Sequence, residues 1–254
     1  MSEVLVRHVH RQGVSTITLD SQHNRNALSA QLLAELSAAL DAAEHVDARA
    51  IVLRHEGPAF CAGADLKERR QGPPDSSPMV NVIERLMDTE RPTIAAVSGA
   101  VRAGGIGLMA ACDLIVVNSS IDFALTEVRI GVTPAIISVP ILRRVPAGKV
   151  AAAMLTGEKF SAVEALAMGL ITHVTDDVSA TVDHLIDGIL AGAPHAVRET
   201  KAMLARVPTL DRATAFTEMR ELSERMFSGP DAAEGMAAFV EKRLPSWNPA
   251  AREQ

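Results

Sequence analysis

Two groups of residues near the middle of the chain have the types and spacing for anion binding and acid–base chemistry. Gly104 and Gly105 stand at the start of a small, apolar segment, residues 106–112, that is predicted to be helical. Glycines that open a helix leave backbone N–H groups exposed, and the positive end of the helix dipole favours an anion there. Glu127 follows further along the chain and offers a carboxylate for proton transfer. The anion could be an enolate oxygen or a phosphate, and these residues leave both open.

A dinucleotide-binding site is the phosphate alternative. Residues 105–110, Gly-Ile-Gly-Leu-Met-Ala, match the Gly-x-Gly-x-x-Ala fingerprint, and Glu127 lies near the distance expected of a ribose-binding acid. Arg102 and Ala103 nevertheless separate the preceding strand from the glycines, whereas the dinucleotide turn follows its strand tightly. Glu127 also comes after a further candidate strand, residues 122–124. The Rossmann-type site is therefore the minor alternative.

The elements that would position these residues alternate between strands and helices, which indicates an α/β fold. Residues 4–10 and 14–20 alternate around a Gly-containing turn and predict a hairpin. Apolar runs predict strands at 50–53, 93–97, 113–117, 122–124 and 171–175. Helical patterns are predicted at 29–45 with Ser29 as its cap, and at 80–88, 106–112, 146–156, 161–168 and 177–191. From residue 194 the pattern is wholly helical, at 194–206, 210–227 and 231–242, which suggests a boundary there.

Three further stretches are expected to be irregular. Residues 55–63 are predicted to form a loop, and the glycines of residues 98–105 are expected to end the strand before them. Residues 71–78 hold three prolines, two serines and a glycine. That composition predicts a mobile loop, which would be either a plain surface connection or a flap over a ligand.

The composition indicates a soluble globular protein. The 254 residues are 48% hydrophobic and 22% charged, and the net charge of −6 with no Tyr and one Trp argues against nucleic acid as a partner. Cys61 and Cys112 fit no metal or redox motif and are expected to be buried, reduced thiols of a cytoplasmic protein. The chain shows neither a signal peptide nor an apolar run near about 18 residues, so no membrane association is expected.

Four segments, taken in order and at the expected separations, resemble the enoyl-CoA hydratase/isomerase (crotonase) family. They are residues 24–28 (Asn-Arg-Asn-Ala-Leu), 60–67 (Phe-Cys-Ala-Gly-Ala-Asp-Leu-Lys), 95–105 and 111–114, and residues 234–243 are similar to the end of such a protein. The resemblance implies a crotonase spiral of β-β-α turns over residues 1–193. It further implies a helical region, residues 194–254, that caps coenzyme A and builds a homotrimer or a dimer of trimers. The implied substrate is an acyl-CoA thioester, whose coenzyme A is part of the substrate, so no cofactor or metal is expected.

The resemblance also assigns roles by position. The backbone N–H groups of Ala64 and Gly104 would bind the thioester oxygen as it becomes an enolate, and Glu127 would be the acid/base. Arg25 is expected near the adenosine 3′-phosphate and Lys242 near the diphosphate. The expected substrate-binding residues are Arg25, Ala27, Ala62, Asp65, Leu66, Lys67, Pro134, Phe227 and Lys242.

One position departs from the family pattern. Family hydratases carry two glutamates that share the water, and the first of these positions is Gly107 here, while the second is Glu127. Residues 132–138 are also bulkier than the family's glycine-rich continuation and are expected to narrow or reshape the acyl end of the pocket. We therefore expect a hydratase or dehydratase with a single acid. An enoyl-CoA isomerase or another enolate chemistry such as decarboxylation is the first alternative, and a non-catalytic acyl-CoA-binding protein is the second.

Overall fold

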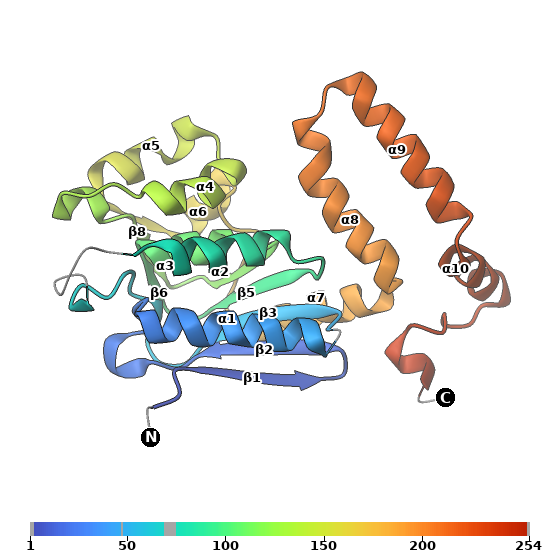
Figure 1. The fold of residues 1–254 in the computed structure, drawn as a ribbon, viewed down its shortest axis with the longest axis horizontal. Coiled ribbons are helices and arrows are strands. Elements are labelled where there is room, and N and C mark those ends of the chain that lie inside the picture. The colour runs from blue at the N-terminus through green and yellow to red at the C-terminus, as the bar shows by residue number, and fades with distance from the viewer. Residues whose placement is uncertain (1–2, 47, 69–74, 253–254) are drawn as a thin grey trace. The chain divides into compact units, whose positions relative to one another are not determined.

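The chain forms two compact units in the computed structural model, which describes residues 3–46, 48–68 and 75–252 (Figure 1). The first unit contains Met1–Thr89 and Thr93–Asp183, and the second contains Glu90–Pro92 and His184–Gln254. Helix α7, Val178–Ala191, runs through the division between them. The predicted roles of the C-terminal region in oligomerisation and in capping coenzyme A stay predictions.

The larger sheet of the first unit has six strands in the order β1-β2-β3-β5-β7-β10. The predicted hairpin is confirmed, because β1 and β2 pair antiparallel around Gln12 and Gly13, whose φ angles of 49° and 80° suit a two-residue turn. All other neighbours in this sheet are parallel. The strands are β1 Val6–Arg11, β2 Val14–Leu19, β3 Ala50–His55, β5 Thr93–Val97, β7 Leu114–Asn118 and β10 His173–Thr175.

A second, smaller sheet has the order β4-β6-β8-β9. Strands β4, β6 and β8 are parallel to one another, and β9 is antiparallel to β8. They are β4 Ala59–Cys61, β6 Ala100–Arg102, β8 Asp122–Ala124 and β9 Lys159–Ser161. Strands β4, β6 and β8 each follow a strand of the larger sheet, and a helix comes next in the chain. The predicted spiral of β-β-α turns is therefore confirmed (Figure 1).

The helices of the first unit begin and end at local signals. Ser29 Oγ accepts a hydrogen bond from the N–H of Leu32 and caps α1, as predicted. Ser161 and Glu164 form a capping box on α6, and Gly157 ends α5 in a left-handed conformation. The helices are η1 Gln22–Asn24, α1 Ala30–His45, α2 Ser77–Asp88, α3 Gly104–Ala110, η3 Glu127–Ile130, α4 Ala135–Arg144, α5 Ala147–Thr156 and α6 Ala162–Met168.

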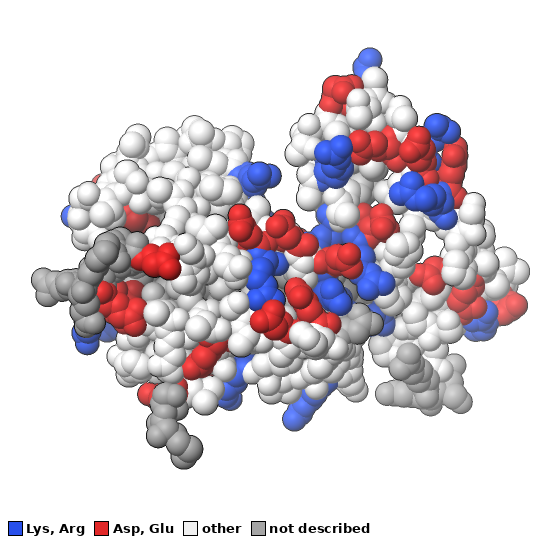
Figure 2. Space-filling model, viewed as in Figure 1, with Lys and Arg blue, Asp and Glu red and all other residues white. Residues whose placement is uncertain are grey.

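The core of the first unit is formed by its sheets and helices α1, α2 and α3, and it extends to buried residues of α4, α5 and α6 (Figure 1). Helix α1 buries Leu32, Leu36 and Leu40 along one face, as the leucine spacing predicts. Phe60 in β4 and Phe123 in β8 are fully buried, so the three-residue strands of the small sheet are anchored by large apolar side chains. The surface over α4, α5 and α6 shows few charges in Figure 2. Its exposed apolar side chains are Val139, Leu142, Leu155, Val163 and Leu166.

The second unit is helical, as predicted. A guanidinium–carboxylate pair between Arg243 and Glu234, 2.7 Å, and a bond from the indole N–H of Trp247 to the carbonyl of Ala191, 3.0 Å, fasten its end. Its elements are α8 Pro194–Arg206, η4 Val207–Thr209, α9 Arg212–Phe227, α10 Pro230–Glu241 and η5 Pro249–Arg252. Across the described residues of both units, none of the helices combines the length and apolarity that crossing a bilayer would need.

Two predictions of irregular structure were wrong in part. Residues 59–61 were expected to lie in a loop but form β4. Residues 100–102 belong to the glycine-rich stretch that was expected to end the preceding strand, but they form a new strand, β6. Both strands take their partners from distant parts of the chain, so their own composition carries little signal. Of the predicted mobile loop 71–78, residues 71–74 lie outside the described part of the chain, and Ser77 begins α2.

Candidate active site

The backbone amide of Ala64 is presented by a short parallel pairing with Leu28. The N–H of Leu28 donates to the carbonyl of Gly63 at 2.8 Å, and the N–H of Asp65 donates to the carbonyl of Leu28 at 3.4 Å. In a parallel ladder the groups of alternate residues point in opposite directions, so the N–H of Ala64 points away from Leu28. Among the described residues this N–H has no acceptor.

The amide of Gly104 is the first of helix α3. A helix leaves its first N–H groups without partners inside the helix, and the N–H of Gly104 has none elsewhere in the described chain. Ala103 aims this amide with an unusual backbone, φ 46° and ψ −122°. The N–H of Ala103 donates to the carbonyl of Ala124 at 2.9 Å, so the turn is bound to the end of β8.

These two amides lie close to each other. A Cβ placed on Gly104 would lie 3.8 Å from the amide nitrogen of Ala64, and a Cβ placed on Gly63 would lie 3.7 Å from the amide nitrogen of Gly104. Two neighbouring donors without acceptors can bind one oxygen between them, which is the arrangement of an oxyanion hole. The structure thus brings together the two amides that the sequence resemblance selected, from β-β-α turns far apart in the chain.

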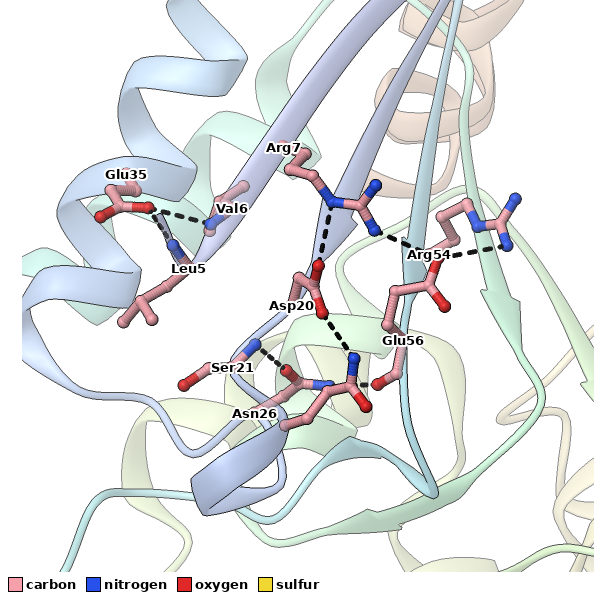
Figure 3. Close-up of polar contacts among 10 residues, drawn as sticks. Leu5, Val6, Arg7, Asp20, Ser21, Asn26, Glu35, Arg54 and Glu56 are labelled. Carbon is pink, nitrogen blue, oxygen red and sulfur yellow. Dashed lines mark hydrogen bonds and ion pairs between the residues drawn. The ribbon is translucent and has the colours of Figure 1, made fainter. Parts of the chain in front are cut away.

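A buried asparagine holds the segment that carries Ala64. Asn26 donates from Nδ2 to the carbonyl of Ala59 at 2.8 Å. It also donates to the carbonyl of Glu56 at 3.1 Å, and its Oδ1 accepts from the N–H of Ser21 at 2.7 Å (Figure 3). Residues 25 and 26 both have positive φ, which turns the Arg25 carbonyl towards the N–H of Ala62 at 3.0 Å. Sequence reasoning assigned no role to Asn26, although its type is the one that tolerates this backbone conformation.

Cys61 packs beneath the same loop. Its Sγ accepts a weak bond from the N–H of Gly63 at 3.4 Å, and burial raises the pKa of the thiol to about 12. The thiol therefore stays protonated and takes a packing role, in agreement with the prediction of a buried, reduced cysteine. Gly105 must lack a side chain, because a Cβ there would come within 2.6 Å of Cys61 Cβ.

Glu127 supplies the carboxylate. It begins η3, three residues after Ala124, so its Cα lies within about 10 Å of the residue that binds the Ala103 turn. Its Oε2 is buried and has no hydrogen-bond partner among the described residues. Burial raises the pKa of this carboxyl above its usual value. A half-buried carboxyl group with one buried oxygen that has no partner among the described residues, and with a raised pKa, is a candidate general acid or base.

The first family glutamate is replaced by Gly107, and the side chain of another residue occupies the space beside it. Gly107 lies in α3, and a Cβ there would lie 2.2 Å from Cγ2 of Ile137, which comes from the first turn of α4. Of the two positions where the family pattern has a glutamate, this chain therefore keeps only Glu127. Sequence reasoning noted the bulk of residues 132–138 but did not select Ile137, because nothing local connects it to Gly107.

The predicted substrate-binding residues fall into two groups. Arg25, Ala62, Leu66 and Lys67 are exposed, Asp65 and Pro134 are partly exposed, and Ala27 is buried, all in loops or element ends of the first unit. Asp65 Oδ1 accepts from the N–H groups of Lys67 at 2.9 Å and Glu68 at 3.4 Å, which fixes the turn after Ala64. Phe227, which is exposed, and Lys242, which ends α10, belong to the second unit. The binding roles of all these residues stay predictions.

Comparison with known proteins agrees with this geometry. The family model described as enoyl-CoA hydratase/isomerase matches residues 10–250. Enoyl-CoA hydratase EchA19 of Mycobacterium tuberculosis is 33% identical, with 94% of this chain and 95% of that protein covered. The mitochondrial methylglutaconyl-CoA hydratase of Mus musculus is 32% identical over 96% of this chain and 83% of its own length.

Solved structures give the same result for the fold. The crystal structure of an enoyl-CoA hydratase from Mycobacterium smegmatis superimposes with a TM-score of 0.90 at 32% identity, over 96% of this chain and 99% of that one. A dinucleotide-binding fold is thereby excluded, and Gly105 and Gly107 lie inside α3 rather than in a turn that leads into it. The chain belongs to the enoyl-CoA hydratase/isomerase family.

Proposed function

We propose that this protein is an enoyl-CoA hydratase-type lyase that adds water across the 2,3 double bond of an acyl-CoA thioester, or removes it. Members of the family act on acyl-CoA thioesters. The N–H groups of Ala64 and Gly104 would donate to the thioester oxygen, which gains negative charge as the enolate forms. A preorganised donor of this kind stabilises such a transition state by about 2.7–4 kcal/mol.

Glu127 would transfer the protons of this reaction. As the carboxylate it accepts a proton from water while the water oxygen bonds to C3. The resulting carboxylic acid then returns that proton to C2 of the enolate, so one group serves as base and acid in turn. The observation that carries the proposal is the buried, unpaired Oε2 of Glu127, close in the chain to the β8 end that binds the Gly104 turn.

The test is the replacement Glu127→Gln, which keeps the shape of the side chain and removes its proton transfer. Hydration of crotonyl-CoA and of a branched glutaconyl-CoA, followed by loss of the enoyl absorbance, should slow by about 10²–10⁴-fold in kcat with little change in KM. Glu158→Gln is the matched control, because Glu158 is an exposed glutamate of the same unit. Turnover that survives in Glu127→Gln would remove Glu127 from the mechanism.

An enoyl-CoA isomerase is the second candidate, and the Gly107–Ile137 contact favours it. Isomerisation moves a proton from one carbon to another and can proceed with a single carboxylate and no water. A 3-enoyl-CoA that is converted faster than the matching 2-enoyl-CoA would identify the isomerase. Tight binding of both without conversion of either would leave the acyl-CoA-binding protein, and decarboxylation would appear as release of CO₂ from a carboxyacyl-CoA.

The remaining predictions extend this proposal. Arg25 and Lys67 are exposed cations on the loops that flank Ala62 and Asp65, where they could reach coenzyme A phosphates. Phe227 and Lys242 are proposed to contact coenzyme A as well, and the loss of CoA affinity in alanine variants would measure each contribution. The homotrimer or dimer of trimers is proposed as the assembly, to be measured by light scattering, and the cytoplasm as its location.

A further inference from the structure

The proposed proton transfer by Glu127 gives no reason for the close contact between Gly107 and Ile137. A Cβ on Gly107 would lie 2.2 Å from Cγ2 and 2.4 Å from Cβ of Ile137, well inside the separation that two carbon atoms tolerate. Position 107 can therefore hold only glycine while Ile137 keeps its place. Ile137 is 4% exposed, so its side chain occupies that space in full.

This contact lies near the two amide donors. Gly104 and Gly107 are three residues apart in α3, so they share a helix face and are separated by about 4.5 Å along the axis. That face is turned towards Ala64, since a Cβ on Gly104 would lie 3.8 Å from the Ala64 amide nitrogen. The Ile137 side chain thus stands about one helical turn from the point where the thioester oxygen would bind.

Contacts along helix α4 hold it against the end of α3 and the core, which restrains Ile137. At the far end of α4, Arg144 donates to the carbonyls of Ala110 at 2.8 Å, Asp113 at 2.7 Å and Cys112, which follow or end α3. Ile141, one turn from Ile137, is fully buried and packs the middle of α4 into the core. An isoleucine in a helix also has one dominant χ1 rotamer, so the wall it forms is stiff.

We propose that Ile137 is a specificity-determining residue, a rigid apolar wall that limits the bulk of the acyl group, and that Gly107 is glycine because Ile137 occupies the space beside it. The wall presents no polar atom, so the part of the acyl group that meets it is a short apolar chain. The inference rests on the proposed function, because it takes an acyl-CoA thioester as the occupant of the site.

The test measures binding of saturated acyl-CoAs, which cannot react. Isothermal titration gives the affinity ratio of octanoyl-CoA to butyryl-CoA for the wild type and for Ile137→Ala. Removing the wall should raise this ratio by about tenfold, the discrimination that a hydrophobic pocket typically achieves per methylene. Ile141→Ala is the matched control, because it deletes the same atoms one turn further along the same helix. Ile137→Val provides a smaller shift in the same direction if Ile137→Ala fails to fold.

A ratio that stays unchanged in Ile137→Ala and Ile137→Val, or that changes equally in Ile141→Ala, would overturn the role of Ile137.

A second experiment tests the pairing of Ile137 with Gly107 by thermal unfolding. Gly107→Ala should lower Tm in the wild-type background and should lower it less in the Ile137→Gly background, since an alanine at 137 would keep the Cβ that lies 2.4 Å from the added atom. Equal losses in the two backgrounds would show that the two positions are not coupled.

The proposed function and this inference fail separately. A wild-type protein that binds acyl-CoAs but turns over neither 2-enoyl-CoA nor 3-enoyl-CoA contradicts the function and leaves the affinity ratio as a valid measurement. A wild-type protein that hydrates crotonyl-CoA, with an affinity ratio indifferent to Ile137, contradicts the inference alone.

Discussion

Ala103 has a backbone conformation that L-residues adopt at a cost. Its φ of 46° with ψ of −122° lies outside the regions open to a residue with a Cβ, and such strain costs of order 1–3 kcal/mol. The turn is nevertheless required, because it places the Gly104 amide beside the Ala64 amide while the Ala103 N–H is bound to β8. The strain therefore lies at the residue that orients the Gly104 N–H donor of the site.

Ala103→Gly should stabilise the protein by about 1 kcal/mol, because relief of strain exceeds the extra chain entropy of glycine. The measurement is urea unfolding followed by circular dichroism. Ala100→Gly is the control, since Ala100 lies in β6 without a positive φ, and it should destabilise by about 0.5–1 kcal/mol. Equal destabilisation by both changes would contradict the argument.

Glu127 shows the same conflict between stability and function at a single side chain. Burial raises the pKa of its carboxyl group, and Oε2 has no hydrogen-bond partner among the described residues, so the folded state resists the charged form. The proposed reaction nevertheless needs the charged form, because the carboxylate is what accepts a proton from water. A bound water or substrate would supply the hydrogen bond that Oε2 of Glu127 lacks. A group of this kind is retained for chemistry rather than for stability.

At the scale of elements, α3 connects the donors, the acyl wall and the core. Its first residue, Gly104, presents an amide, and its middle, at Gly107, receives Ile137. A helix end leaves its last carbonyls without partners inside the helix, and Arg144 of α4 donates to the last one, that of Ala110, and to the carbonyls of residues 112 and 113 just beyond the helix. A helix of seven residues is held in place by these tertiary contacts, since it is too short to be stable alone.

Arg144→Met should therefore destabilise the protein by about 2–4 kcal/mol, because it removes charge-assisted bonds to three partly buried carbonyls and keeps most of the apolar stem. Urea unfolding gives the value. Arg143→Met is the matched control on the neighbouring, exposed residue of α4, and it should change stability by less than about 0.5 kcal/mol. Similar effects of the two changes would show that the bonds to α3 contribute little.

At the scale of the molecule, a buried histidine links stability to pH. His55 at the end of β3 accepts a bond at Nε2 from the N–H of Ser98, 3.1 Å, and packs edge-on against Phe60. Burial lowers its pKa from the ordinary 6.5, because protonation would charge a desolvated ring and place a donor against another donor. At a pH between the folded and the unfolded pKa, the His55 ring is therefore neutral in the folded protein and protonated in the unfolded chain.

The sign of the pH effect follows from this difference. The contribution of His55 is complete above pH 6.5 and is lost as pH falls from 6.5 towards the lower folded pKa. We expect Tm to decrease between pH 7 and pH 5, and to decrease less in His55→Gln. His45→Gln, at an exposed position, should keep the wild-type slope. His8, whose pKa burial and His10 also lower, accounts for a remaining slope of the same sign.

Some predictions from sequence succeeded because their signals are local. The apolar run of residues 93–97 is β5, the leucine spacing and Ser29 mark α1, and a proline opens α8 where the helix was predicted. The short strands β4, β6 and β9 were missed, since three-residue strands are defined by the neighbours they pair with. The site residues were found through the family resemblance, and Ile137 escaped it because its partner lies in another helix.

The sequence by itself determined most of the longer strands and helices, the resemblance to the family, and the presence of one carboxylate where two are usual, because periodicity, caps and residue identity are properties of the chain. Only the tertiary structure decided that the amides of Ala64 and Gly104 lie close together, that Oε2 of Glu127 is buried without a partner among the described residues, and that Ile137 fills the space beside Gly107. Those facts depend on how separate β-β-α turns stack, and stacking is set by packing between residues far apart in the chain.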